Sequence, residues 1–206
     1  MDTPTLNPRK RYAAGEGDRL RQDLLTAAGE LMVTTGDIDT ISLRAVARKV
    51  GVSPTAVYRH FDDHLDLLRE AVDTCWSEFR TELEAAAATS DDPFIAFRAM
   101  GDAYVRFALE RTGQYRVLFS NKVDIGHESG PGLTAFWVLV DIVERMLTAN
   151  DDPRDPFFVS VQVHTWIHGM VDLCGSHPGV PWPPTSELLD SLGVALALVP
   201  RPALAD

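Results

Sequence analysis

The chain has 206 residues, of which 45% are hydrophobic and 24% are charged, and its formal net charge is −11. This length is enough to bury a substantial core in one large domain or two small ones. Two cysteines are too few for a disulfide framework or a zinc knuckle, so we interpret Cys75 and Cys174 as small buried hydrophobic residues. No secretory leader pattern opens the chain and no apolar run approaches the roughly 18 residues of a membrane span, which predicts a cytoplasmic protein with no membrane partner.

The net negative charge of the chain comes entirely from residues 65–206. Residues 1–64 contain nine basic and nine acidic residues, whereas residues 65–206 contain ten basic and twenty-one acidic ones. Residues 40–61 contain four basic residues and no Asp or Glu. A positive segment in an acidic chain favours contact with a phosphate backbone, so nucleic acid would meet the N-terminal part and be repelled by the rest.

Residues 1–17 are rich in Pro, Gly and charge and show no periodicity, which predicts a mostly disordered arm. Its cluster Arg9-Lys10-Arg11 can follow a phosphate backbone or enter a minor groove, or it can be a solvated tail without register. Asp18 is then expected to cap a helix that runs to about Thr34, and Gly36 to end it.

Two short helices joined by a tight turn are predicted within residues 42–61. Ser42 and Ser53 precede them as caps, Pro54 suits a first helical position, and Gly51 falls where the first helix must stop. The first of these helices is predicted to have an apolar side and a basic side. The apolar side consists of Leu43, Val46, Ala47 and Val50, and the basic residues Arg44, Arg48 and Lys49 lie away from it. The pattern is that of a helix-turn-helix.

At these residues the chain resembles the DNA-binding head of the tetracycline-repressor (TetR) family, over a segment from about Arg19 to Val72. The motifs that carry the resemblance are Leu43-Arg44-Ala45-Val46-Ala47, Gly51-Val52-Ser53 and Tyr58-Arg59-His60-Phe61, followed by Leu65, Leu67 and Leu68. Turn, caps and aromatic positions agree in register. The resemblance implies an all-helical, ligand-responsive DNA-binding regulator.

One position departs from the family pattern. Where the resemblance leads us to expect a Lys that touches phosphate, at the start of the next helix, the chain has His64, preceded by Asp62 and Asp63. A neutral imidazole donates only weakly and two nearby carboxylates repel phosphate, so DNA binding is expected either to be weaker at this end or to strengthen as the pH falls.

The rest of the chain is predicted to be helical. Asp63 is a candidate cap for a long helix through about Ala88, which can join the head to a body as one stiff rod. Further helices are expected after Ser90-Asp91-Asp92-Pro93, from about Tyr115 to Ser120-Asn121, over Gly132–Asn150, over Phe157–Leu173 and from Ser186 onward, with loops at 122–132 and 174–185.

The last helix is apolar on most of its circumference and therefore has to be covered on two sides, most economically by a second copy of the chain. The family resemblance implies the same, because the last two long helices of each TetR subunit form a four-helix bundle across a twofold axis. The run His164–Leu173 further resembles the ligand-domain subgroup named for a Trp, a His and a Gly. Gly169 in this run is consistent with the close approach of a neighbouring helix.

Aromatic residues are frequent in the predicted body, either as simple core or as the lining of a cavity for a flat or lipophilic effector. The family resemblance implies such an effector site, and we expect its lining among Trp76, Phe79, Phe97, Tyr104, Phe107, Phe119, Phe136, Trp137 and Trp166. His164, His168 and Asp172 recur every four residues, which is acceptable spacing for a metal, but we interpret them as hydrogen-bonded polar groups and expect no metal and no cofactor.

No nucleophile with a base and no phosphate-binding glycine loop is evident, so we expect no enzyme. The predicted fold is all-α: a disordered arm (1–17), a three-helix helix-turn-helix head (18–64) and a body for ligand binding and dimerisation (65–206). The function predicted is a homodimeric repressor, released from a palindromic operator by a small lipophilic effector. Expected DNA contacts are Ser42, Arg44, Lys49, Ser53, Thr55, Tyr58, Arg59, His60 and His64. The alternative is a small-molecule binding protein whose head no longer reads DNA.

Overall fold

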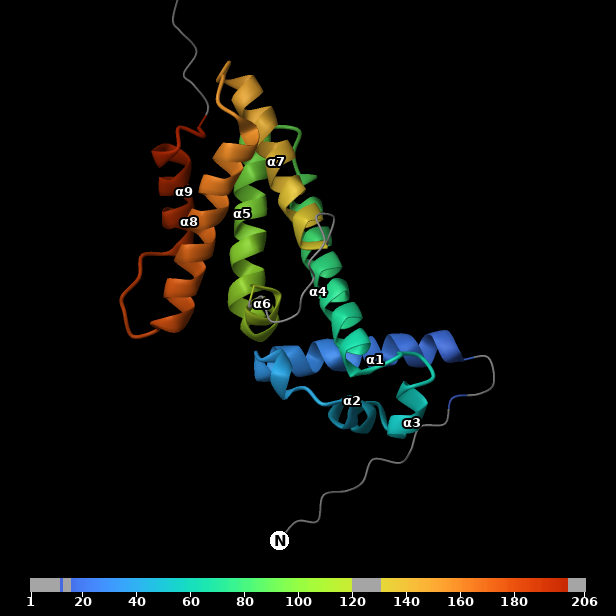
Figure 1. Cartoon of the computed structure of the whole chain (residues 1–206). Coiled ribbons are helices and arrows are strands. Elements are labelled where there is room, and N and C mark those ends of the chain that lie inside the picture. Colours follow the sequence, from blue (N-terminus) through green and yellow to red (C-terminus); the bar gives the residue numbers. More distant parts are fainter. Residues whose placement is uncertain (1–11, 13–15, 120–130, 200–206) are drawn as a thin grey trace, which may run out of the picture. The chain divides into compact units, whose positions relative to one another are not determined.

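The computed structural model describes residue 12, residues 16–119 and residues 131–199. Over these ranges the chain forms helices and no strand, so the all-α prediction is confirmed (Figure 1). The helices are α1 (Gly17–Thr35), the 3-10 helix η1 (Ile38–Thr40), α2 (Leu43–Val50), α3 (Pro54–Val57), α4 (His64–Ala87), α5 (Pro93–Glu110), α6 (Thr112–Phe119), α7 (Pro131–Ala149), α8 (Pro156–Ser176) and α9 (Thr185–Ala195). The predicted loop at 122–132 falls mostly outside the described residues.

The chain divides into two compact units. The first, called the head below, comprises Met1–Cys75 with Gly113–Gly126, and the second, called the body, comprises Trp76–Thr112 with His127–Asp206. Helix α4 supplies residues to both units. The functional boundary after residue 64 stays a prediction.

The helix ends of the head follow from individual side chains. The Ser42 hydroxyl accepts a hydrogen bond from the Ala45 amide at 3.2 Å, and the Ser53 hydroxyl accepts one from Ala56 at 3.3 Å. Gly36 and Gly51 adopt φ values of 61° and 84°, in the left-handed region where glycine has no Cβ penalty, and end α1 and α2. The predicted caps and stops of the helix-turn-helix are confirmed.

Four predicted boundaries are wrong. Glu16 occupies the N-cap position of α1, so Asp18 lies inside the helix, and α9 begins at Thr185 after Pro184, with no side-chain cap from Ser186. Helix α8 continues to Ser176, past the predicted end, because no proline interrupts it earlier. Helix α6 begins at Thr112, before the predicted start at about Tyr115.

The head buries one side of each of its helices. Helix α2 packs on α1 and on α3, and the interior consists of fully buried apolar side chains: Leu24, Met32, Ile38, Ile41, Val46, Val57 and Leu67. The first turn of α6 approaches α1 closely, since a Cβ added to Gly113 would lie 2.1 Å from the carbonyl oxygen of Val33. The Gln114 amide contacts the Cys75 sulfur at 3.3 Å, which fixes α6 further within the head.

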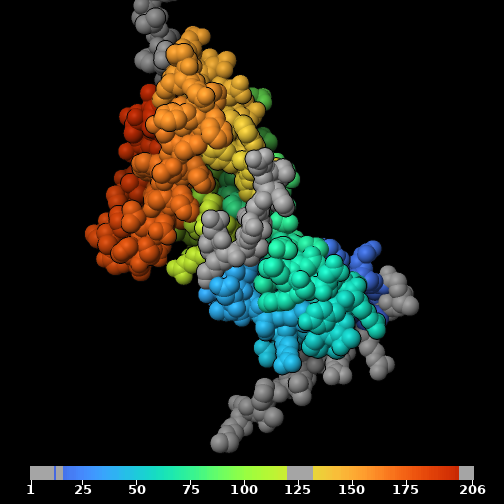
Figure 2. All heavy atoms as spheres, in the orientation of Figure 1, coloured from blue at the N-terminus to red at the C-terminus, as the bar shows by residue number. Residues whose placement is uncertain are grey.

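The body is a packed set of helices in which α5 contacts α7, α8 and α9. Its interior includes Phe107, Ile142, Val143, Met146, Val159, Val163 and Leu192. The Arg98 guanidinium on α5 donates to the Asp190 carboxylate on α9 at 2.6 Å, and a Cβ at Gly101 would lie 3.3 Å from Leu189. Helices α8 and α9 lie side by side at one edge of the body (Figures 1 and 2). Among the described residues, no helix is long and apolar enough to cross a membrane.

Candidate nucleic-acid interface

Helix α3 presents polar side chains outward from a buried apolar anchor. Val57 is fully buried, whereas Thr55 and Arg59 are exposed and Tyr58 has 56% of its surface exposed. After Val57 the chain tightens, because the amides of Arg59 and His60 donate to the carbonyls of Ala56 and Val57. Residues 54–60 therefore form one short segment of helix and turn, whose outward side chains are exposed and can contact a partner.

At the N-terminal end of α2, Ser42 and Arg44 are also exposed. Free amides at a helix start attract anions, which suits a phosphate at Ser42. Lys49 is engaged differently, because its ammonium lies 2.8 Å from the Glu30 carboxylate on α1. Sequence inspection missed this pair, since the two residues come from different helices and no local spacing connects them.

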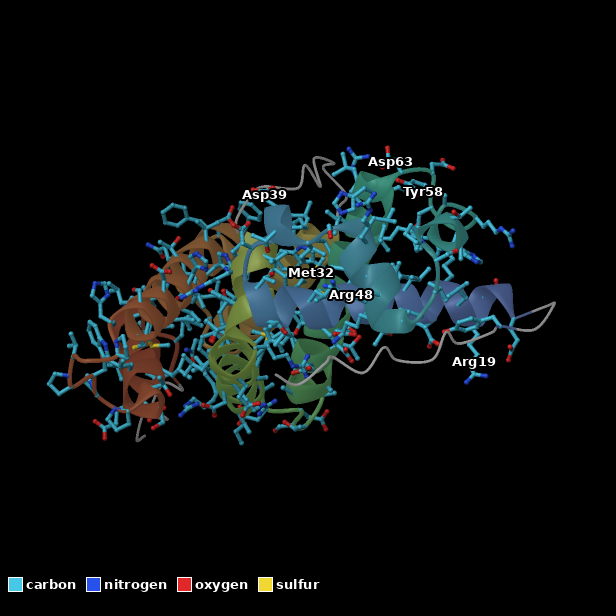
Figure 3. The ribbon with its side chains drawn as sticks, turned by 90° about the horizontal axis from the view of Figure 1, so that it is seen from below. Arg19, Met32, Asp39, Arg48, Tyr58 and Asp63 are labelled. Carbon is cyan, nitrogen blue, oxygen red and sulfur yellow. The ribbon has the colours of Figure 1, made fainter. Side chains whose placement is uncertain are left out.

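The acidic residues after α3 are used to start α4. Asp63 Oδ1 accepts a hydrogen bond from the Asp66 amide at 2.8 Å, which confirms the predicted cap, and Asp66 Oδ2 accepts one from the Asp62 amide at 3.1 Å. Figure 3 shows Tyr58 and Asp63 at the outer edge of the head. His64 is half-buried, and its Nε2 is enclosed with no hydrogen-bond partner among the described residues, so this atom is not presented to a phosphate.

Arg21 on α1 holds the end of α3 in place. Its guanidinium lies 5.1 Å from the centre of the Phe61 ring and also pairs with the Glu70 carboxylate on α4. Phe61 is buried and directly follows His60. Arg21 therefore links α1, α4 and the turn after α3, a role that sequence inspection missed because Glu70 is 49 residues away.

The expected effector residues do not gather around one place. Rings of Trp76, Phe79, Tyr104 and Phe107 form a buried cluster in the body, with Phe79 4.7 Å from Phe107 and 5.3 Å from Tyr104. Phe97 is buried, while Phe136 and Trp166 are half-buried. Phe119 belongs to the head, where its ring lies 4.6 Å from Tyr115. Trp137 is 50% exposed and lines an open groove of α4 and α7 together with Glu84, Asp141 and Arg145.

His164 lies at the edge of the buried ring cluster. Its ring is 6.1 Å from Tyr104, 5.7 Å from Phe136 and 5.9 Å from the stacked ring of His168. Burial lowers the pKa of His164, and the neighbouring His168 lowers it further. Asp172 does not complete a metal site with these two residues: within the described part of the chain, no three His, Cys, Asp or Glu side chains form such a group.

A capped helix, a glycine turn and a short exposed helix over an apolar core define a helix-turn-helix DNA-binding domain. The chain belongs to the TetR family of transcriptional regulators. Residues 24–71 match the model described as "Bacterial regulatory proteins, tetR family", and residues 97–193 match "Tetracyclin repressor-like, C-terminal domain". This family consists of DNA-binding regulators and not of enzymes, so the predicted family and the predicted lack of catalysis are confirmed.

One curated protein and two solved structures are among those similar to this chain. An uncharacterized HTH-type transcriptional regulator of Haemophilus influenzae is 30% identical over 105 residues, 51% of each chain, so the match spans about half the length of this curated relative. A protein of unknown function from Rhodococcus sp. RHA1 has the same fold, with a TM-score of 0.73 and 23% identity over 95% of this chain and 97% of that one. The structure of a TetR family transcription regulator from Marinobacter aquaeolei VT8 has a TM-score of 0.66 and 16% sequence identity, over 88% of this chain and 95% of that one.

Proposed function

We propose that the protein is a homodimeric repressor that binds a palindromic operator and is released by a small lipophilic effector. The observation that carries the proposal is the short segment 54–60, whose outward side is exposed and polar and whose inward side is anchored by Val57. Such a segment fits a major groove, where Thr55, Tyr58 and Arg59 would reach base edges or phosphates. Ser42 and Arg44 would hold the flanking phosphates.

Dimerisation through α8 and α9 is supported by apolar side chains on their outer surfaces. On α8, Phe158 is 63% exposed, and Val161 and Leu173 are exposed on the same side; on α9, Val194 is 68% exposed. A Cβ at Gly169, between them, would meet no atom within 4 Å, so this stretch of α8 is open to a neighbouring helix. A second copy would cover this surface, and two heads so paired would read half-sites about one helical turn, roughly 34 Å, apart.

The dimer has its own test. Phe158→Asp places a charge in the proposed interface and should convert the dimer into a monomer. Sedimentation analysis distinguishes the two states. Ile95→Asp, at an exposed apolar residue of α5, serves as the control. Loss of the dimer in both variants, or in neither, would contradict an interface made by α8 and α9.

An effector site in the body is supported by the ring cluster around Phe79 and by the partly buried imidazole of His164 beside it. We place the site within the segment that resembles the subgroup named for a Trp, a His and a Gly. To release the operator, the effector must bind the arrangement that cannot bind DNA more tightly than the arrangement that can. An effector with equal affinity for the two arrangements would leave their populations unchanged.

Selection of bound sequences from random duplex DNA tests the DNA-binding proposal. The expected result is an enriched palindrome, with Arg59→Ala lowering affinity for it at least tenfold while the dimer persists. Arg80→Ala, on the body, is the matched control and should bind as the wild type does. No enrichment at low salt would instead favour the second candidate, a small-molecule binding protein. The observation that supports this candidate is the pair of carboxylates, Asp62 and Asp63, which follow α3 and repel phosphate.

A further inference from the structure

Within the body, the C-terminal half of α4 and helix α7 lie side by side and run in the same direction (Figure 1). Near the start of α7, a Cβ added to Gly132 would lie 3.2 Å from the Trp76 ring of α4. Near the end of α7, the Arg145 guanidinium donates a hydrogen bond at 2.9 Å to the carbonyl oxygen of Asp91, just past the end of α4. The two contacts are separated by about 20 Å along α7.

A groove of about 470 Å³ opens between α4 and α7 in this region. Residues 85–88 at the end of α4 are four consecutive alanines, and Ala87 and Ala88 line the groove. Methyl side chains are too short to fill the space between two helices, so a hollow remains where larger residues would form a packed seam. The groove therefore follows from the sequence of α4.

The α7 side of the groove carries a large aromatic side chain. Trp137 lines the groove and has 50% of its surface exposed. Its ring is supported by the Phe157 ring of α8, at a centre-to-centre distance of 5.9 Å. A supported indole with half of its surface open offers an apolar contact and an electron-rich ring face to a ligand.

Carboxylates outnumber cations along the groove. Glu84 on α4 and Asp141 on α7 line it, and both are exposed. Of the described residues that line the groove, only Arg145 is cationic; it lies about 12 Å beyond Trp137 along α7, and its guanidinium already donates to a backbone carbonyl. Glu84 also lies 3.7 Å from the Arg80 guanidinium, but an exposed pair of this kind is weak in water. The groove beside Trp137 and Asp141 therefore attracts positive charge.

We propose that this groove binds an organic cation, an aromatic or alkyl ammonium compound. The ammonium group would lie between the carboxylates of Glu84 and Asp141, and the hydrocarbon part would lie against Trp137. Indole attracts a cation more strongly than the other aromatic side chains do. An uncharged ligand would gain only the apolar contact, and an anion would be repelled by the two carboxylates.

The site is separate from the effector site that we propose beside His164. The residues that line the groove come from α4 and α7 and from the residue after α4, whereas His164 lies on α8 and contacts Tyr104 of α5. Binding of a cation in the groove requires no operator. Its test can therefore be made without DNA.

Titration of the full-length protein with benzyltrimethylammonium tests the site. The binding is followed by NMR of the indole N–H groups after ¹⁵N labelling; the chain has four tryptophans, and Trp137→Phe identifies the Trp137 peak. The expected result is a saturable shift of this peak. N,N-dimethylbenzamide and phenylacetate, an uncharged and an anionic probe of similar size, should bind about fivefold or more weakly than the cation.

Carboxylate variants test the charge contribution. Glu84→Gln and Asp141→Asn should each weaken binding of benzyltrimethylammonium about threefold. Glu110→Gln is the matched control, because Glu110 is an exposed carboxylate at the end of α5 that does not line the groove, and it should bind as the wild type does. All three side chains are exposed, so the melting temperatures should agree within a few degrees.

Four results would overturn the proposal. The Trp137 peak could fail to shift with the cation, or the three probes could bind equally well, which would make the groove an unselective apolar surface. Glu110→Gln could weaken binding as much as Asp141→Asn does, which would assign the effect to the overall charge of the body. Lastly, the peak could respond to dilution of the protein and not to the cation, which would show that a second copy of the chain covers the groove.

Discussion

Gly113→Ala tests the packing of α6 on α1. A Cβ at residue 113 would lie 2.1 Å from the Val33 carbonyl oxygen and 2.5 Å from that of Met32, roughly 1 Å inside van der Waals contact. Both obstacles are backbone atoms inside a helix and cannot rotate away. Helix α6 would have to move off α1, which also weakens the 3.3 Å contact between Gln114 and Cys75. We expect a loss of about 3 kcal/mol in the free energy of unfolding, the upper part of the range for overpacked cores.

Urea unfolding followed by circular dichroism measures this loss. Gly175→Ala is the matched control, because Gly175 lies in the last turn of α8 and a Cβ there would meet no atom within 4 Å. The control should be neutral or more stable by up to about 1 kcal/mol, since alanine favours a helix. Equal unfolding free energies for the two variants would refute the close approach of α6 and α1 on which the argument depends.

Three further predictions concern charged and titratable side chains. Arg44→Ala should weaken operator binding more than Lys49→Ala, because the Lys49 ammonium already forms an ion pair with the Glu30 carboxylate at 2.8 Å. Anisotropy titrations at low salt that rank the two variants in the opposite order would contradict this prediction. Asp63→Asn retains an oxygen cap for α4 and removes a negative charge beside α3, so it should raise operator affinity about two- to fivefold without changing the melting temperature; unchanged affinity would place this carboxylate too far from phosphate to matter. Burial, and secondly the adjacent imidazole of His168, lower the pKa of His164 in the folded protein. The unfolded chain therefore binds a proton at His164 more readily, and the stability of the protein falls as the pH drops below about 6.5. His164→Gln should make the melting temperature fall less steeply over this pH range, and an equally steep fall in the variant would assign the pH dependence to other groups.

The helix-turn-helix could be predicted from sequence because each of its boundaries depends on one local side chain. Ser42 and Ser53 need only reach an amide three residues ahead, and Gly51 needs only to adopt a positive φ. Prediction failed at α1 and α9, where more than one residue could begin the helix. A cap requires both an acceptor and the right backbone turn, and Asp18 and Ser186 supply only the acceptor.

The electrostatics of the head could not be predicted in the same way, because they depend on which helices meet. Lys49 is one of several basic residues in the sequence, but its pairing with Glu30 depends on the packing of α2 on α1. Arg21 carries no local signal either, and it acquires a role only because its guanidinium lies over the Phe61 ring and pairs with the Glu70 carboxylate. Basic residues near a recognition helix therefore divide into those free to contact DNA and those that hold the head together.

The aromatic pattern of the body has a similar limit. Helical spacing shows which side of a helix faces inward, but a packed core and a cavity produce the same spacing. Phe79 contacts Tyr104 and Phe107 at ring-centre distances of 5.3 and 4.7 Å, and rings in such contact leave no room for a ligand between them. We therefore expect the proposed effector to bind beside this cluster, where the half-buried His164 supplies the polar group that a packed apolar core does not need.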